Sequence, residues 1–476
     1  MNTNLMNTNL MNTNLMNTRL IRTPFQAQVW RTRKYVDEAR ARMSLADYWF
    51  MLGFWLALFY VADPFSLRLE KIGLTKHLPL MISLSGAIMI NIGTKIFVSD
   101  LSRLYDRYKR RYWEVLKAAL PLALMGGWIV LGSLYARKHE GIGNSFITVG
   151  LYMLFALVTA RVVMLSAARE TMVKSFIYFA ILASLFMTLK MAIMHDDHSS
   201  PYHELEFLII PLMVFFALQP GKVWPTLMTL FFVIAGLLFR KNTGFIVLAL
   251  TLIYLWLAEW RFRFRESVTF RFWTLFWMVI VIIAGLALAG YLAYQRGEIM
   301  PSGNPGYRMH TYEQAWERFL ESPFYGTSFT GAGTEKFTGF QILVARGNLP
   351  THSDVLDFLA QGGVLAIFLW LWAYVRVGRF SYRHVLSKRR RDQMSIAGHT
   401  FACMSLMSIA VYAFNPILLQ PAKSLLLWGI FGMLLGIGLH RQRQELDGDA
   451  ASEADRTDEP AAPRKNRLYR LKHSRT

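Results

Sequence analysis

The sequence contains one cysteine, Cys403, and few acidic residues, since 31 Asp and Glu stand against 52 Lys and Arg. A single cysteine excludes a disulfide within the chain. Because Cys403 lies inside an apolar block, we expect a small buried side chain there. The sequence also has no HExxH pair of histidines, and its TGAG segment follows no strand of a βαβ unit. These absences argue against a helical zinc site and against a nucleotide site in that segment.

The N-terminal segment lacks the apolar core of a secretory signal peptide. Residues 1–20 repeat the polar unit MNTNL, with MNTRL last, and such a repeat cannot form a packed structure. Residues 19–42 are basic, as expected before a first membrane span. We therefore expect residues 1–44 to be a disordered repeat followed by a basic cytoplasmic leader.

Long apolar runs dominate the rest of the chain. Hydrophobic residues make up 54% of the 476 residues, and the mean hydropathy is +0.29. The apolar residues come in blocks of about twenty, the length that crosses a hydrocarbon core of roughly 30 Å. The sequence thus predicts an all-α polytopic membrane protein with about 12 transmembrane helices and one large, partly helical extracytoplasmic loop. The expected spans are 45–64, 77–98, 115–136, 145–168, 174–194, 204–219, 223–239, 243–260, 272–295, 354–375, 396–416 and 422–440.

The distribution of charge predicts the orientation. The net charge is +21, but the basic residues cluster in short loops between apolar blocks, as at 100–113, 261–271 and 376–393. This pattern follows the positive-inside rule and argues against binding of nucleic acid. The loop at 296–353 carries five Lys or Arg and five Glu, so it is nearly neutral. We expect this loop outside the cytoplasm and both termini inside.

The chain therefore divides into five parts by composition. The expected parts are a cytoplasmic leader at 1–44, transmembrane helices 1–9 at 45–295, an extracytoplasmic catalytic loop at 296–353, transmembrane helices 10–12 at 354–440 and a charged cytoplasmic tail at 441–476. The tail is acidic and then basic, a composition typical of disorder.

The large loop contains a predicted amphipathic helix at 305–322. Asn304 is a suitable N-cap, and Pro305 suits the first turn. Arg308 then lies near the helix N-terminus, where free backbone N–H groups favour anions such as a lipid diphosphate. The alternative is a structural ion pair with Glu313 or Glu317.

Two further outer positions are candidates for chemistry. Arg240 lies between two expected spans and offers planar donors suited to phosphate oxygens, although an interfacial Arg can simply snorkel. His352 precedes a long apolar helix, whose positive end favours the neutral imidazole. A neutral His is suited to act as a general base, and the alternative is a residue that only caps or packs.

Weaker candidates complete the set of possible substrate contacts. Arg161 lies inside an expected span, where Arg is costly and often functional, yet it can also snorkel toward the cytoplasm. Trp316 offers an aromatic face to a sugar ring, and Arg346 is a loop residue able to contact sugar. The run HDDH at 195–198 resembles metal ligands, but a solvated turn explains it better, so we expect no metal site.

These residues resemble the O-antigen ligase and polymerase family of bacterial surface-polysaccharide assembly. The resemblance is clearest over 231–375, and its parts occur in the family's order. Ser353 stands where the family often has Asn after the His. The residues that carry the resemblance are Arg240, Thr243, Gly244, Arg308, Trp316, Pro323, Gly326, Gly331, Gly333, His352, Gly362 and Gly363.

The resemblance implies a metal-independent, GT-C-like membrane glycosyltransferase at the outer face of the bacterial cytoplasmic (inner) membrane, without a cofactor. The donor would be a glycan on undecaprenyl diphosphate. The acceptor would be a sugar hydroxyl on lipid A-core, for a ligase, or on a growing polysaccharide, for a polymerase. The remaining partners would be membrane lipids.

The residue chemistry suits such a transfer. Arg240 and Arg308 can stabilise the leaving diphosphate, and His352 can remove the acceptor proton. About 12 spans with a basic cytoplasmic face would also suit a polysaccharide or lipid-linked oligosaccharide transporter or flippase. That alternative stays open, although no internal repeat supports it.

Overall fold

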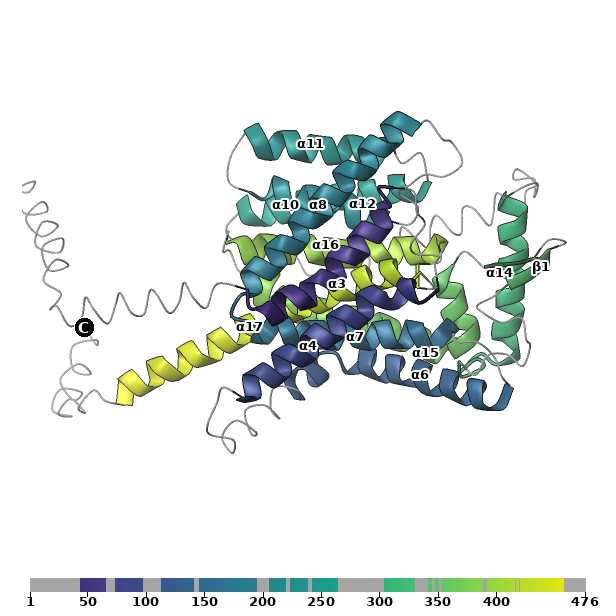
Figure 1. Ribbon diagram of the computed structural model, residues 1–476, viewed down its shortest axis with the longest axis horizontal. Coiled ribbons are helices and arrows are strands. Elements are labelled where there is room, and N and C mark those ends of the chain that lie inside the picture. Colours follow the sequence, from purple (N-terminus) through teal and green to yellow (C-terminus); the bar gives the residue numbers. More distant parts are fainter. Residues whose placement is uncertain are drawn as a thin grey trace, which may run out of the picture.

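The computed structural model describes most of the helical part of the chain. The described residues are 43–65, 73–96, 113–140, 145–194, 205–219, 223–238, 242–263, 304–329, 341–344, 347–350, 353–387, 392–415, 417–418 and 420–457. The structure is helical almost throughout, and its helices pack into one bundle with α14 at one edge and the C-terminal end of α17 at the other (Figure 1). One antiparallel hairpin, β1 Gln341–Val344 with β2 Gly347–Pro350, accompanies the helices.

Most helices overlap the expected spans, and several extend beyond them. In chain order the helices are α3 Leu45–Ala62, the 3₁₀ helix η2 Gly73–His77, α4 Leu78–Ile96, α6 Leu120–Glu140, α7 Ser145–Leu165, α8 Arg169–Met194, α9 Glu206–Ile209, α10 Leu212–Ala217, α11 Val223–Leu238, α12 Asn242–Arg263, α14 Asn304–Glu321, α15 Asp354–Ser381, the π-helical turn η3 Tyr382–Leu386, α16 Gln393–Phe414 and α17 Pro421–Thr457.

Among the described residues, six helices are long and apolar enough to cross a membrane, as expected of a helical membrane protein. They are Leu45–Ala62, Ile147–Leu165, Arg169–Lys190, Asp354–Leu386, Gln393–Phe414 and Pro421–Leu446. Four shorter apolar helices cover the expected spans at 115–136, 204–219, 223–239 and 243–260. The expected span at 272–295 lies outside the described residues. The count of about twelve spans therefore stays a prediction.

The expected span at 204–219 is divided into two short helices. The division falls at Pro211, which caps α10 and accepts a hydrogen bond from the N–H of Val214 at 3.0 Å. Proline has no N–H and cannot continue the α-helical ladder, so the chain begins a new helix there. Both pieces are almost entirely buried, which makes this segment part of the bundle interior.

The C-terminal helices extend further than expected. We expected disorder from about residue 441, but α17 continues to Thr457, so that prediction is wrong up to this residue. Two contacts hold the extension: Arg441 pairs with Asp392 at 2.6 Å, and His384 contacts Glu445 at 3.0 Å. Polar and charged partners at the start of α16 and on η3 thus stabilise a segment whose composition alone suggests disorder.

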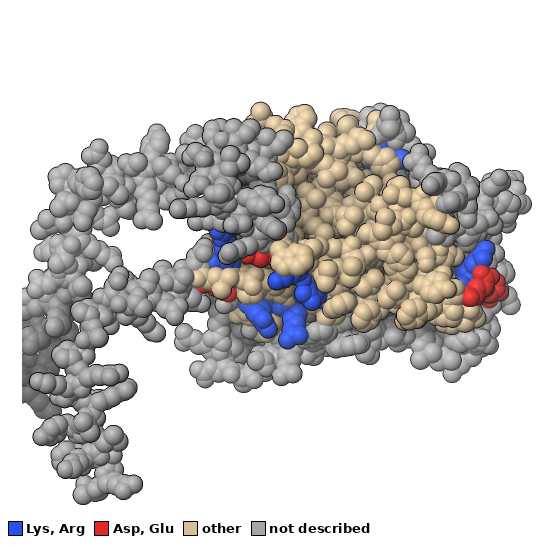
Figure 2. Space-filling view, turned by 90° about the horizontal axis from the view of Figure 1, so that it is seen from below, with Lys and Arg blue, Asp and Glu red and all other residues tan. Residues whose placement is uncertain are grey.

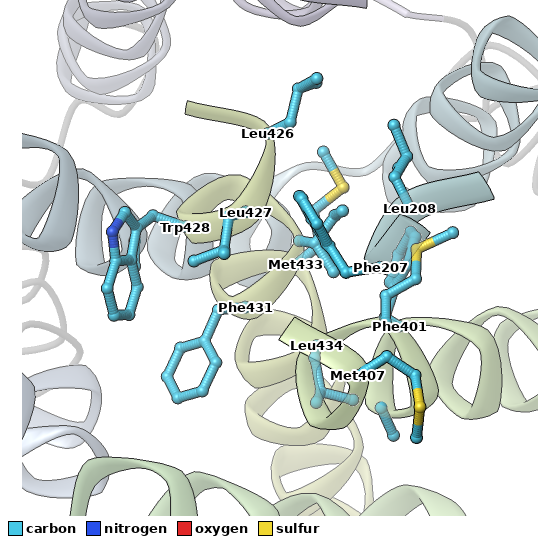
Figure 3. Close-up of a cluster of buried hydrophobic side chains, with 14 of the residues drawn as sticks. Phe207, Leu208, Phe401, Met407, Leu426, Leu427, Trp428, Phe431, Met433 and Leu434 are labelled. Carbon is cyan, nitrogen blue, oxygen red and sulfur yellow. The ribbon is translucent and has the colours of Figure 1, made fainter. Parts of the chain in front are cut away.

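The core of the bundle lies around α16 and α17, whose span residues are buried almost completely. Figure 3 shows Trp428 and Phe431 of α17, Phe401 of α16 and Phe207 of α9 among the buried side chains that fill this region. Cys403 of α16 is also buried, as the sequence predicts. Helix α16 ends and helix α17 begins beside the start of α15, so the core fixes the position of the start of α15.

Candidate functional site

The N-terminus of α15 is anchored to the connection between α16 and α17. Ser353 is its N-cap, and the hydroxyl accepts a hydrogen bond from the N–H of Leu356 at 3.3 Å. Asp354 is buried, and its carboxylate accepts from the N–H groups of Ile417 and Leu418 at 2.7 and 3.2 Å. Hydrogen bonds to a charged acceptor are strong, so this carboxylate fixes the start of α15 in the bundle.

The N-terminus of α12 is tied to the same connection. Asn415 caps the C-terminus of α16, and its side-chain amide donates to the hydroxyl of Thr243 at 3.4 Å. Both side chains are buried. The segment 415–418 therefore contacts the first turn of α12 through Asn415 and the first turn of α15 through Ile417 and Leu418. Two helices far apart in the sequence begin at the same end of the bundle.

Helix α14 packs along the first turns of α15. Ala315 and Ala360 form a small buried cluster with Leu356. Beyond this cluster, the N–H of Val364 donates to the carbonyl oxygen of Pro323 at 2.9 Å. From the first of these contacts to the second, the residue numbers rise on both segments. Helix α14 and the start of α15 therefore run side by side with the same polarity.

Helix α15 is interrupted where the segment after α14 meets it. Gly363 has φ 61° and ψ −162°, outside the helical region. The N–H groups of Val364 and Leu365 donate to the carbonyl oxygens of Pro323 and Phe324 at 2.9 and 3.1 Å. The turn at 323–329 therefore supplies acceptors to backbone groups of α15 at the interruption, which locks α14 onto α15.

Two glycines make this joint possible. Gly326 has φ 55°, and a Cβ on it would lie 2.6 Å from the carbonyl oxygen of Ala360. A Cβ on Gly363 would lie 2.5 Å from the carbonyl oxygen of Phe324. Thr327 adds a side-chain hydrogen bond of 2.6 Å to the buried Gln361. The glycines at 326 and 363, noted in the sequence as part of the family resemblance, thus have a packing role.

The predicted site residues are described to different extents. Arg240, His352 and Arg346 lie outside the described residues. The backbone of Arg308 lies in the first turns of α14, which confirms the predicted helix, while its side chain is not described. Trp316 is half exposed on α14 and contacts Phe319, with ring centroids 5.0 Å apart.

Arg161 lies away from the starts of α12 and α15. The side chain is buried within α7 rather than extended to the surface. Its neighbour Ala160 lies against Gly436 of α17, because a Cβ on Gly436 would approach the carbonyl oxygen of Ala160 to 2.6 Å. Gly436 is roughly 20 Å along α17 from Pro421 at about 1.5 Å per residue. A role for Arg161 in binding the carrier stays a prediction.

Sequence reasoning missed four residues that shape this region: Asp354, Asn415, Thr327 and Gln361. The pair Ser353–Asp354 before an apolar run is a helix N-cap signal, so the cap is predictable from the sequence. Asn415 follows the apolar run of α16 directly and precedes a proline, which indicates a helix end. The partners of all four residues lie far away in the sequence, so their contacts could not be predicted from it.

No metal site can be assigned in the described part of the chain, where no three His, Cys, Asp or Glu side chains gather suitably. The run at 195–198 lies outside that part. The region at the starts of α12 and α15 offers helix N-termini and buried hydrogen-bonding groups.

Comparison with known proteins identifies one family. Residues 225–371 match the family model described as O-antigen ligase. No curated protein matches the chain. The matched segment contains α11 almost completely, α12, α14 and the first part of α15, together with Arg240, Arg308 and His352. The match confirms the resemblance seen in the sequence.

Proposed function

We propose that this protein, whose residues 225–371 match the O-antigen ligase family, transfers a glycan from undecaprenyl diphosphate to an acceptor sugar hydroxyl. The family acts on lipid-linked glycans in surface-polysaccharide assembly, which implies a glycosyltransferase-like activity. The transfer takes place at the outer face of the cytoplasmic membrane, because the basic loops mark the opposite face as cytoplasmic.

The observation that carries the proposal is the shared anchor of α12 and α15. Arg240 precedes Thr243 by three residues, and His352 precedes Asp354 by two. A chain reaches at most about 3.6 Å per residue, so the two positions stay within roughly 11 and 7 Å of their anchored neighbours. The anchors meet at the segment 415–418. This arrangement supports a common site for Arg240 and His352.

The packing of α14 supports placing Arg308 at the same site. Position 308 precedes Ala315 by seven residues, so it lies within about 20° of the face that contacts α15. Going back from the Ala315 contact, position 308 is roughly 10 Å away along α14 at 1.5 Å per residue. His352 precedes Leu356 of the same contact by four residues and Ala360 by eight. Since the helices have the same polarity, both positions approach the same level.

The proposed reaction is a direct displacement at the anomeric carbon. The acceptor hydroxyl oxygen forms a bond to this carbon while the bond from the carbon to the diphosphate oxygen breaks. His352 takes the hydroxyl proton, and the lipid diphosphate leaves with increased negative charge. Arg240 and Arg308 stabilise that charge, with help from backbone N–H groups at the start of α14. No step requires a metal ion.

The environment of His352 suits a base. Because it directly precedes the N-cap Ser353, we expect the positive end of α15 to favour the neutral imidazole. The family's Asn at this place and Ser353 here both have the oxygen acceptor that an N-cap requires. The change from Asn to Ser therefore conserves the start of the helix.

Deletion of the gene tests this function, with surface polysaccharide separated on a gel. Loss of polymer from lipid A-core, with polymer still present on its lipid carrier, identifies a ligase. Collapse to a single repeat unit, or loss of a separate exopolysaccharide, identifies a polymerase. An unchanged gel in the deletion strain and in a strain carrying His352→Ala would contradict glycan transfer and favour the transporter or flippase alternative.

A further inference from the structure

A cavity lies at the C-terminal end of α15, away from the helix start at Asp354. Its volume is about 560 Å³, and it is bordered by the residues that precede α6, the last turns of α15 with η3, and α17 near Leu439. Beyond the interruption at Gly363, helix α15 continues to Ser381, a length of roughly 27 Å at 1.5 Å per residue, which is close to a hydrocarbon core of about 30 Å. The cavity and the start of α15 therefore lie near opposite faces of the membrane.

The cavity is rich in positive charge. Lys117, Arg376, Arg379 and Arg383 line it, against one acidic residue, Glu114. Arg379 and Arg383 are exposed, and their guanidinium groups form no ion pair or hydrogen bond with other residues that the structure describes. Figure 2 shows a face on which Lys and Arg side chains gather beside a broad uncharged surface. Two guanidinium groups with free donors are suited to an anion.

Two other basic groups are held in place by the protein. Arg376 donates from Nε to the carbonyl oxygens of Lys117 and Ala118 at 2.9 and 3.2 Å, where the chain turns before α6. The amino group of Lys117 lies 5.6 Å from the ring centroid of Trp113, within reach of a cation–π contact. The positive wall of the cavity is thus partly preorganised, which lowers the entropic cost of binding.

The cavity also has an aromatic wall. Trp372 and Phe380 line it from α15. Side chains of this kind pack against an acyl chain, while the arginines donate hydrogen bonds to the oxygen atoms of a phosphate. A ligand that suits both walls has a phosphate head and an apolar tail. Basic pockets between transmembrane helices on the cytoplasmic side bind lipids of this class.

We propose that this cavity binds an anionic phospholipid, with its phosphate against Arg379 and Arg383 and an acyl chain along Trp372 and Phe380. In the orientation set by the basic loops, the lipid belongs to the cytoplasmic leaflet. The site is separate from the proposed transfer site, so its occupancy is measurable whether or not the protein transfers glycans.

Native mass spectrometry of the purified full-length protein in detergent tests the proposal. The probes are phosphatidylglycerol and phosphatidylcholine with identical acyl chains. We expect preferential binding of phosphatidylglycerol, weakened about fivefold by Arg379→Gln or Arg383→Gln, since one basic group near a membrane surface contributes about that factor. Glu114→Gln removes the single negative charge of the cavity, so it should strengthen binding.

Lys174→Gln is the matched control. Lys174 lies on α8 five residues after Arg169, which contacts His440 of α17, so it is at the same end of the bundle as the cavity. It pairs with Glu170 at 2.7 Å and does not line the cavity. We expect Lys174→Gln to leave the affinity for phosphatidylglycerol unchanged. Equal weakening by Arg379→Gln, Arg383→Gln and Lys174→Gln would overturn a specific site.

Two further measurements complete the test of lipid binding. Inorganic phosphate that displaces phosphatidylglycerol at low millimolar concentration would overturn the lipid assignment, because the acyl chain would then contribute nothing. Unchanged thermal unfolding of Arg379→Gln and Arg383→Gln shows that the variants are folded. If these folded variants bind phosphatidylglycerol as tightly as the parent protein, the proposal is wrong.

Discussion

The backbone N–H of Val364 in α15 donates to the carbonyl oxygen of Pro323, which follows α14, at 2.9 Å. This bond joins α15 to the segment that follows α14. It lies at the point where Gly363 interrupts α15. The interruption exposes backbone donors, and the segment after α14 accepts them. The joint therefore fixes how α14 lies against the start of α15.

Substitution of Gly363 by Ala should disrupt the joint. Its φ of 61° and ψ of −162° fall in a region essentially restricted to glycine, which costs about 1–3 kcal/mol for other residues. The added Cβ would also meet Phe324 at 2.5 Å. We expect a lower thermal unfolding temperature and loss of surface polymer on gels.

Gly127→Ala in α6 is the control for that substitution, since no atom lies within 4 Å of the added Cβ. It should leave both the unfolding temperature and the polymer unchanged. Normal polymer in Gly363→Ala would show that the interruption of α15 has no part in the activity.

Substitution of Asp354 by Ala should loosen the start of α15. It removes the acceptor for the N–H groups of Ile417 and Leu418, and each unsatisfied buried group costs about 1–3 kcal/mol. Transfer activity and stability should both fall, whereas Asp354→Asn, which retains one oxygen acceptor, should be milder. Unfolding temperature and polymer yield are the measurements.

Asp392→Asn provides the comparison at the other end of the bundle. Asp392 also caps a helix and pairs with Arg441, so its substitution costs stability without touching the start of α15. We expect reduced stability with polymer retained. If Asp354→Ala and Asp392→Asn lost the same amount of stability and also the same amount of polymer, Asp354 would have no special relation to the site.

Substitution of Thr243 by Val tests the anchor of α12. The change keeps the shape of the side chain but removes the acceptor for Asn415, a bond of 3.4 Å. A neutral hydrogen bond contributes about 1 kcal/mol, so stability should change little. Transfer should fall several-fold, because the position of Arg240 depends on this anchor. A transfer rate equal to that of the parent would contradict the proposed role of the anchor.

Substitution of Arg308 by Ala should abolish detectable polymer while protein levels stay normal. Loss of a well-placed charge stabiliser raises a barrier by roughly 2.7–4 kcal/mol, or 10²–10³ in rate. Arg308→Lys should also be poor, because Lys lacks the planar pair of donors. Polymer on gels and protein on immunoblots are the measurements.

Arg318→Ala on the same helix is the matched control. Arg318 pairs with Glu321 at 2.8 Å on the exposed side of α14, and surface pairs of this kind contribute about 0–1 kcal/mol. We expect normal polymer in this variant. Loss of polymer in Arg318→Ala as severe as in Arg308→Ala would show that any change on α14 is harmful.

The sequence predicted those features that depend on local pattern. The helix bearing Arg308 was located within about one residue, because its cap, its proline and its apolar face are all local signals. The buried Cys403 and the six long apolar helices follow from composition in the same way.

Features that depend on distant partners were not predictable. The tie between Asp354 and the segment 417–418 joins residues more than sixty positions apart. The continuation of α17 past residue 441 depends on Asp392 and His384, which lie on other elements. The interruption at Gly363 depends on the distant acceptor at Pro323. The apolar pattern across 354–375 therefore predicted one continuous helix.

The most direct test of the account is transfer in proteoliposomes containing the purified protein, an undecaprenyl-diphosphate-linked glycan and an acceptor glycan. The account predicts acceptor elongation with release of the lipid diphosphate, no detectable elongation by His352→Ala, and elongation by Arg318→Ala close to that of the parent. Elongation by His352→Ala at the parent rate would contradict the account.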